Sequence, residues 1–148
     1  MNNIEKALKE NKMFITKTKG DSMFPMLVEG RDSVIIAPPE FPLKKYDVPV
    51  YRRDGHYTMH RIVKVTNKGY IICGDNRSHL EKDITDKDII GVLAAFYHNG
   101  KLIKCTDEDY IRYAKKVCRN LPVRKIKSLI RRVFKTAALK FKKNRFLQ

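Results

Sequence analysis

The chain has 148 residues, of which 43% are hydrophobic, and it carries a formal net charge of +16. This length fits one domain of ordinary size with a short appendage, and the composition excludes a disordered or fibrous protein. The charge is uneven, because residues 1–105 hold 18 Lys or Arg against 13 Asp or Glu, whereas residues 106–148 hold 14 against 3. The C-terminal end is therefore expected to meet an anionic partner, which composition alone does not identify as nucleic acid, membrane or acidic peptide.

Cysteine usage and hydropathy favour a cytoplasmic protein without a membrane anchor. The three cysteines form no CxxC pair, and no Cys or His cluster has the spacing of a zinc site, so we expect reduced thiols, no metal site and no cofactor. Residues 1–12 are polar and lack the apolar stretch of a signal peptide. The longest apolar run, residues 89–97, is about half of the roughly 20 residues that a membrane-spanning helix needs.

Along the chain, a short helix is predicted over residues 4–12. From Phe14 onward, β-branched or aromatic runs alternate with turn residues, which is typical of strands. Asp54-Gly55 and Asn99-Gly100 are typical of hairpin tips. The predicted strands cover residues 14–18, 33–37, 48–52, 57–65, 70–73 and 89–97. This pattern predicts a mainly β fold, with a small antiparallel sheet or partial barrel over residues 1–105.

Residues 106–148 change to a helical period and are predicted to form a basic amphipathic extension. A first helix places apolar residues on one face and ends near Pro122. A second helix follows, with an apolar stripe opposite a face rich in Lys and Arg, and no acidic residue occurs from Tyr110 to the end. The stripe residues are Val123, Ile126, Leu129, Ile130, Val133, Phe134, Ala137, Ala138 and Phe141.

A turn bordered by glycine and proline is the first candidate for chemistry. The segment Lys19-Gly20-Asp21-Ser22-Met23-Phe24-Pro25-Met26-Leu27 follows a predicted strand. Gly20 lets the backbone bend tightly beside Ser22, and Pro25 fixes the exit from the turn. Such a turn presents a hydroxyl at the edge of a sheet, although the segment by itself favours an ordinary turn serine.

A histidine and two aspartates are candidates to assist Ser22. A serine hydroxyl is a poor nucleophile until a neighbouring base takes its proton, and a neutral imidazole suits that task near pH 7. His60 is the candidate base, and a solvent-facing strand histidine is the alternative. Asp75 and Asp83 are candidates for the carboxylate that fixes the imidazole tautomer, and each is also typical of a turn aspartate that caps its own backbone.

In order along the chain, these motifs resemble the signal peptidase I and LexA-type serine peptidase superfamily over about residues 14–97. The motifs are Gly20-Asp21-Ser22-Met23-Phe24-Pro25, Gly30-Arg31-Asp32, Leu43-Lys44-Lys45-Tyr46-Asp47, His60-Arg61-Ile62-Val63 and Gly74-Asp75-Asn76. The resemblance implies that Ser22 is the nucleophile and that His60 is the base. Histidine in place of lysine at the second position is similar to the endoplasmic-reticulum and sporulation-type branch.

The resemblance also implies what surrounds the pair. In the histidine branch an aspartate after the Gly-Asp-Asn motif orients the base, which favours Asp83 over Asp75. Many bacterial signal peptidases have a serine at the position of Gly20 that helps hold the oxyanion, so here the backbone N–H of Ser22 is expected to carry more of that role. The substrate is expected to pair as an extended strand with residues 16–19 and 57–60.

We therefore predict a stand-alone serine endopeptidase, with a catalytic domain over residues 1–105 and a helical extension over 106–148, that cleaves a leader or precursor peptide. One alternative is a non-catalytic peptide-binding module docked to an anionic membrane through residues 122–148. Another is a nucleic-acid-binding protein that uses Arg131 and Arg132. The repressor branch binds DNA through an N-terminal domain, for which the 21 residues before Ser22 are too few. We expect a cytoplasmic protein, either free or peripheral at the inner face of the membrane.

Overall fold

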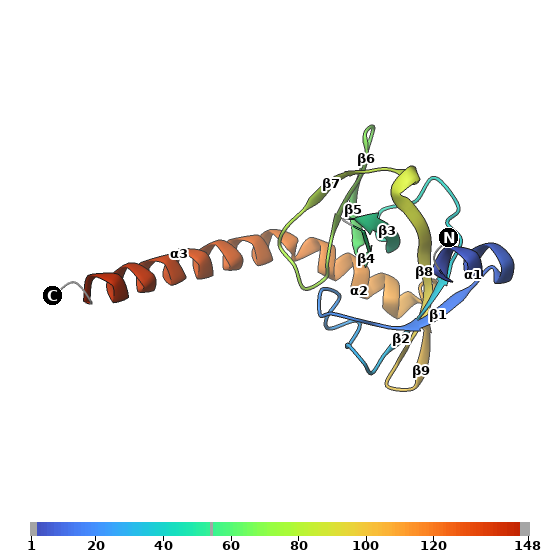
Figure 1. The fold of residues 1–148 in the computed structure, drawn as a ribbon, viewed down its shortest axis with the longest axis horizontal. Helices are drawn as coiled ribbons and strands as arrows, with labels where there is room; N and C mark the ends of the chain where they lie inside the picture. Colours follow the sequence, from blue (N-terminus) through green and yellow to red (C-terminus); the bar gives the residue numbers. More distant parts are fainter. Residues whose placement is uncertain (1–2, 54, 146–148) are drawn as a thin grey trace.

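A computed structural model describes residues 3–53 and 55–145, with side chains described for residues 4–53 and 55–134. Two antiparallel sheets form the body of the molecule, and helices lie at both ends of the chain (Figure 1). The predicted hairpin residue Asp54 lies outside the described residues, and the stripe side chains beyond Phe134 lie outside the described side chains. The mainly β fold expected from the sequence is confirmed.

The larger sheet is curled and has the strand order β1-β2-β8-β3-β4, with β9 paired to β8. Its strands are β1 (Phe14–Lys17), β2 (Ser33–Ala37), β3 (Pro49–Arg53), β4 (His56–Met59), β8 (Ile89–His98) and β9 (Lys101–Lys104). Every pairing is antiparallel. In the part of the chain that the structure describes, β1 and β4 each pair with one neighbour, so each has a free hydrogen-bonding edge.

The smaller sheet has the order β5-β6-β7. Its strands are β5 (Arg61–Thr66), β6 (Gly69–Cys73) and β7 (Glu81–Ile84), and a 3-10 turn at Asp86–Asp88 leads from β7 into β8. Because β4 belongs to the larger sheet and β5 to the smaller, the chain crosses between the two sheets at His60.

Two apolar clusters hold these sheets together. The first lies under the larger sheet and is covered by side chains from α1 (Asn3–Asn11) and α2 (Glu108–Arg119). Its buried members include Ile4, Leu8, Met23, Met26, Val34, Ile36, Val50, Leu93, Phe96 and Tyr110. The second joins the two sheets and consists of Leu43, Tyr51, Ile62, Tyr70, Ile72, Ile84 and Ile89. Since Met23 and Met26 belong to the first cluster, the Ser22 turn is anchored in the core.

The last helix, α3 (Leu121–Arg145), leaves the body of the molecule (Figure 1). Pro122 stands in its first turn, where proline sacrifices no intrahelical hydrogen bond. Leu121 is buried, but the side chains that follow on the described part of the helix are largely exposed. Among the described residues, no helix combines the length and the apolar character that crossing a bilayer requires.

Asp32 is a buried carboxylate at the end of the loop that carries Ser22. Its hydrogen bonds lead us to predict that the stability of the fold depends on pH. Asp32 Oδ2 accepts hydrogen bonds from the backbone N–H of Val28 at 2.9 Å and from His98 Nδ1 at 2.9 Å. Arg31 Nε donates to Asp32 Oδ1 at 2.7 Å. The hydrogen bond from Arg31, with those from Val28 and His98, lowers the pKa of Asp32 to about 2 despite its burial.

We expect Asp32→Asn to lower the free energy of unfolding at pH 7 by about 2 kcal/mol. Because the folded pKa lies below the unfolded one, the carboxylate stabilises the fold above about pH 4, and this contribution disappears as the pH falls toward 2. Urea unfolding at several pH values should therefore show the gap between wild type and variant closing in acid. Glu29→Gln, at an exposed position of the same loop, is the control, and a gap that stays constant down to pH 2 would contradict the assignment.

Candidate active site

Ser22 lies in the turn between β1 and β2, in a short run of hydrogen-bonded turns. The Phe24 N–H donates to the Asp21 carbonyl at 3.1 Å, and the Leu27 N–H donates to the Met23 carbonyl at 3.1 Å. Gly20 has a φ of 82°, the left-handed conformation that glycine adopts without strain. The Ser22 N–H makes no backbone hydrogen bond in the part of the chain that the structure describes. A tight turn therefore presents both the hydroxyl and a free N–H of the same residue.

His60 occupies the crossing between the two sheets. Its side chain is only 12% exposed, and it lies between the last residue of β4 and the first residue of β5. The sequence pattern predicted one continuous strand over 57–65, and the structure corrects this by dividing the strand at His60. The residues before and after His60 are equally typical of strands. The sequence pattern therefore does not indicate that the chain passes from one sheet to the other at this point.

The turn after β6 borders both Ser22 and His60. The Asn76 N–H donates to the Ser22 carbonyl at 2.8 Å. A Cβ atom placed on Gly74 would lie 2.7 Å from the Ser22 carbonyl oxygen and 3.2 Å from His60 Cδ2. Gly74 is therefore packed between the two candidate residues, and only glycine leaves room for both. The Cδ2 side of the His60 ring is therefore the side that faces Gly74.

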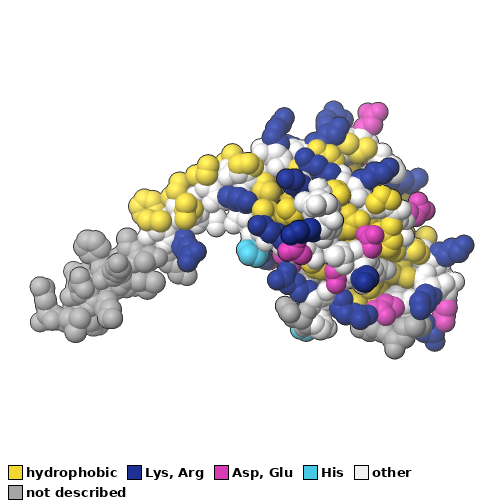
Figure 2. Space-filling model, turned by 90° about the horizontal axis from the view of Figure 1, so that it is seen from above, with side chains coloured by type: hydrophobic (Ala, Val, Ile, Leu, Met, Phe, Trp, Pro, Cys, Tyr) yellow, Lys and Arg dark blue, Asp and Glu magenta, His cyan; other side chains and the backbone are white. Residues whose placement is uncertain are grey.

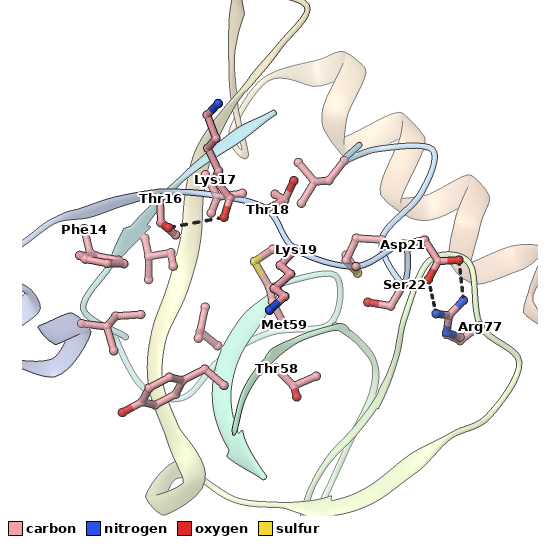
Figure 3. Close-up of a pocket in the computed structure, with 18 residues that line it drawn as sticks. Phe14, Thr16, Lys17, Thr18, Lys19, Asp21, Ser22, Thr58, Met59 and Arg77 are labelled. Atoms are coloured by element: carbon pink, nitrogen blue, oxygen red, sulfur yellow. Dashed lines mark hydrogen bonds and ion pairs between the residues drawn. The ribbon is translucent and has the colours of Figure 1, made fainter. Parts of the chain in front are cut away.

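The Ser22 hydroxyl makes no hydrogen bond to His60 within the described residues. Figure 3 shows the hydroxyl directed toward the cavity beside it, while Asp21 in the same turn is joined to Arg77 by an ion pair. In sites without substrate, catalytic hydrogen bonds are commonly longer than in the substrate complex. The described geometry thus brings Ser22 and His60 to a shared neighbour, with the hydroxyl on the cavity side.

The carboxylate bound to His60 is Glu81, which the sequence pattern did not predict. His60 Nδ1 lies 2.6 Å from Glu81 Oε1, and the Tyr51 hydroxyl donates to the same oxygen at 2.9 Å. Arg53 forms an ion pair with the other Glu81 oxygen. Glu81 is the first residue of β7, whose short charged sequence, EKDI, carries little strand signal. Because the sequence did not predict β7, it gave no reason to choose Glu81.

The structure places the two predicted aspartates elsewhere. Asp83 is exposed and has a φ of 60°, because a bulge in β7 sets four residues, Glu81 to Ile84, against three residues of β6, Tyr70 to Ile72. Asp75 is buried and forms a two-pronged ion pair with Arg61, at 2.8 Å from Nε and 2.7 Å from Nη2. Neither aspartate makes a hydrogen bond to His60 in the described structure.

The electrostatics of the His60 group favour a neutral imidazole beside a charged carboxylate. Burial lowers the pKa of His60 below 6.5, although the hydrogen bond and charge of Glu81 oppose that shift. Burial raises the pKa of Glu81, but the hydrogen bonds from His60 and Tyr51 outweigh it, so the net pKa is lowered. Burial also raises the pKa of Tyr51, which keeps its hydroxyl protonated and able to donate to Glu81. The accepting carboxylate keeps a proton on Nδ1, which leaves Nε2 as the basic nitrogen.

A cavity of about 610 Å³ opens beside Ser22. It lies between the two edges of the curled sheet, with Thr16 and Lys17 of β1 on one side and Thr58 and Met59 of β4 on the other (Figure 3). Apolar side chains line its interior, namely Ile4, Phe14, Met23, Leu27, Val34, Ile36, Val50 and Tyr57. The cavity therefore combines two free strand edges with an apolar floor. Within the described residues, no group of three or more His, Cys, Asp or Glu side chains is placed to hold a metal ion.

Comparison with known proteins gives one family match. The family model described as Peptidase S24-like matches residues 3–94, which is more than half of the chain and includes Ser22, His60, Gly74 and Glu81. No curated protein matches the sequence.

Proposed function

The chain belongs to the Peptidase S24-like family, and from this premise we propose that it is a serine endopeptidase with Ser22 as nucleophile, His60 as general base and Glu81 as the residue that positions His60. One observation carries the proposal. Glu81 holds His60 at Nδ1. The His60 ring packs against Gly74, and Gly74 also borders Ser22. Histidine at this position also supports a place in the histidine-base branch of the superfamily.

The proposed reaction begins with attack of Ser22 Oγ on a peptide carbonyl. His60 Nε2 takes the hydroxyl proton, and Glu81 stabilises the imidazolium that forms. The developing oxyanion accepts a hydrogen bond from the free N–H of Ser22, a role that fits glycine at position 20. Collapse of the tetrahedral intermediate releases the amine, which receives the proton from His60, and water then hydrolyses the acyl-enzyme by the same steps in reverse.

Substrate binding is proposed to use the free edges of β1 and β4. An extended peptide placed in the cavity has a strand edge on each side, so its backbone can hydrogen-bond to one or both, while the apolar floor accepts alternate side chains. This arrangement supports cleavage of an unstructured segment, such as the leader of a precursor peptide, rather than of a folded domain.

The test uses a library of peptides derived from a digested proteome, incubated with the full chain and read by mass spectrometry for new N-termini. Wild type is expected to produce cleavages with a shared sequence preference, and Ser22→Ala and His60→Ala are expected to produce none. Ser78→Ala, in the neighbouring turn, and His56→Ala, at an exposed position of β4, are the matched controls. Equal cleavage by wild type and Ser22→Ala would refute the mechanism. Peptide binding without turnover would assign the groove to a non-catalytic binding module.

A further inference from the structure

The described part of α3 carries a row of apolar side chains that the protein does not cover. Their exposed fractions run from 48% for Ile130 to 71% for Phe134. The row consists of Val123, Ile126, Leu129, Ile130, Val133 and Phe134. We call this set the α3 apolar face. An isolated surface leucine or valine is ordinary, but a contiguous apolar surface on one element indicates contact with another phase or molecule.

The α3 apolar face is separated from the charges of the helix. At 3.6 residues per turn, the six apolar residues fall within an arc of about 140°, whereas Lys125, Lys127 and Arg131 lie outside it. Figure 2 shows the hydrophobic side chains along one side of the helix where it leaves the body. The helix is therefore amphipathic along a stretch that makes few contacts with its own domain.

Charge distinguishes among the molecules that could cover this face. From Leu121 to the end the sequence has ten Lys or Arg and no Asp or Glu. A second copy of the chain would bring two strongly positive helices together. Nucleic acid would neutralise the charges but leave the apolar face in water. An anionic lipid surface accommodates both the positive charges and the apolar face. Its headgroups contact the Lys and Arg side chains, and its acyl boundary receives the apolar side chains.

We propose that α3 lies in the plane of an anionic membrane surface and binds it through the α3 apolar face and the flanking Lys and Arg side chains. The root of the helix is fixed to the body beside the candidate active site. Leu121 is buried, and Arg124 donates hydrogen bonds to the backbone carbonyls of Gly74 and Asp75. Docking of α3 thus holds the Ser22 turn near the bilayer. The binding itself does not depend on the proposed peptidase activity.

The experiment is flotation of the full chain with two kinds of vesicles, one of phosphatidylcholine alone and one with about a third phosphatidylglycerol. Wild type is expected to float with the anionic vesicles, and added salt is expected to weaken the binding. Ile126→Asp with Val133→Asp is expected to lower the partition coefficient by about tenfold or more. Lys127→Glu with Arg131→Glu is expected to do the same on anionic vesicles. Because these positions are exposed, the melting temperature should not change.

The matched control is Lys64→Glu with Lys68→Glu, which changes the net charge equally at exposed positions of the β5–β6 hairpin. It is expected to retain most of the binding. Four results would overturn the proposal. The first two are failure of wild type to bind anionic vesicles and equal loss in the control. The third is a wild-type dimer in sedimentation velocity that Ile126→Asp with Val133→Asp converts to monomer. The fourth is tight binding to a DNA duplex in place of vesicles.

Discussion

Replacing Glu81 with glutamine is expected to reduce kcat/KM by roughly 10⁴-fold. The glutamine amide has nearly the same shape as the carboxylate, but its NH₂ group can donate to His60 Nδ1. That donation would move the imidazole proton to Nε2, the nitrogen that must accept the proton of Ser22. The mutation would therefore leave the fold in place, but Nε2 of His60 would no longer have a free lone pair to accept a proton.

The pH profile gives a second readout that a structural role would not produce. For wild type, kcat/KM should rise with pH through the pKa of His60, which burial sets below 6.5. Since the Glu81 carboxylate favours the protonated imidazole, its removal lowers the pKa of His60 further, and the acid limb should move to lower pH. Rates of peptide cleavage by wild type and Glu81→Gln from pH 4 to pH 8 measure both effects.

Asp83→Asn is the control for this prediction, because Asp83 is the residue that the sequence motif favours and it lies on the same strand. Its exposed side chain leads us to expect activity within about twofold of wild type. A large loss in Asp83→Asn with full activity in Glu81→Gln would return the positioning role to Asp83. Loss of the melting transition in Glu81→Gln would instead show that the contacts to Tyr51 and Arg53 hold the fold.

The strand pattern of the sequence was sufficient to predict most of the fold. The predicted strand at 33–37 has the observed bounds. Those at 70–73 and 89–97 differ from the observed strands by one residue at one end, and the strand predicted at 48–52 is shifted by one residue from the observed β3. These strands have one or both faces buried, so their hydrophobic patterns are strong. By contrast, β7 and β9 are short and mostly exposed, and the pairing with β6 and β8 that makes them strands is a long-range property that no local pattern records.

The candidate site was predictable where it depends on ordered motifs and not where it depends on sheet geometry. Ser22 and His60 stand in motifs that a resemblance can recognise, and Gly74 borders both of them. Glu81 is two residues from the predicted Asp83, but the β7 bulge decides which acidic side chain faces the imidazole. An acidic residue in a short charged segment has no distinguishing mark until the register of the strand is known.

The buried ion pair between Arg61 and Asp75 is expected to support the whole site. The Arg61 and Asp75 side chains are 0% and 1% exposed. Arg61 Nη1 also donates to the Tyr46 carbonyl at 3.0 Å and to the Tyr110 hydroxyl at 3.0 Å, while the Tyr113 hydroxyl donates to Asp75 Oδ2 at 3.2 Å. Arg61 follows His60 and Asp75 follows Gly74, so the ion pair joins the two candidate segments. The hydrogen bonds to Tyr110 and Tyr113 join this pair to α2.

Asp75→Ala should therefore destabilise the protein by about 3–5 kcal/mol, because it leaves the Arg61 charge buried without its partner. The expected fall in melting temperature is roughly 10 °C. The double variant Arg61→Leu with Asp75→Leu removes both charges and should be less destabilised than Asp75→Ala, since a buried ion pair replaced by apolar side chains costs far less than an unpaired charge. Urea unfolding of the two variants and wild type measures the difference. If the double variant is the less stable one, the network of hydrogen bonds to Tyr46, Tyr110 and Tyr113, rather than the burial of an unpaired charge, accounts for the stability of this region.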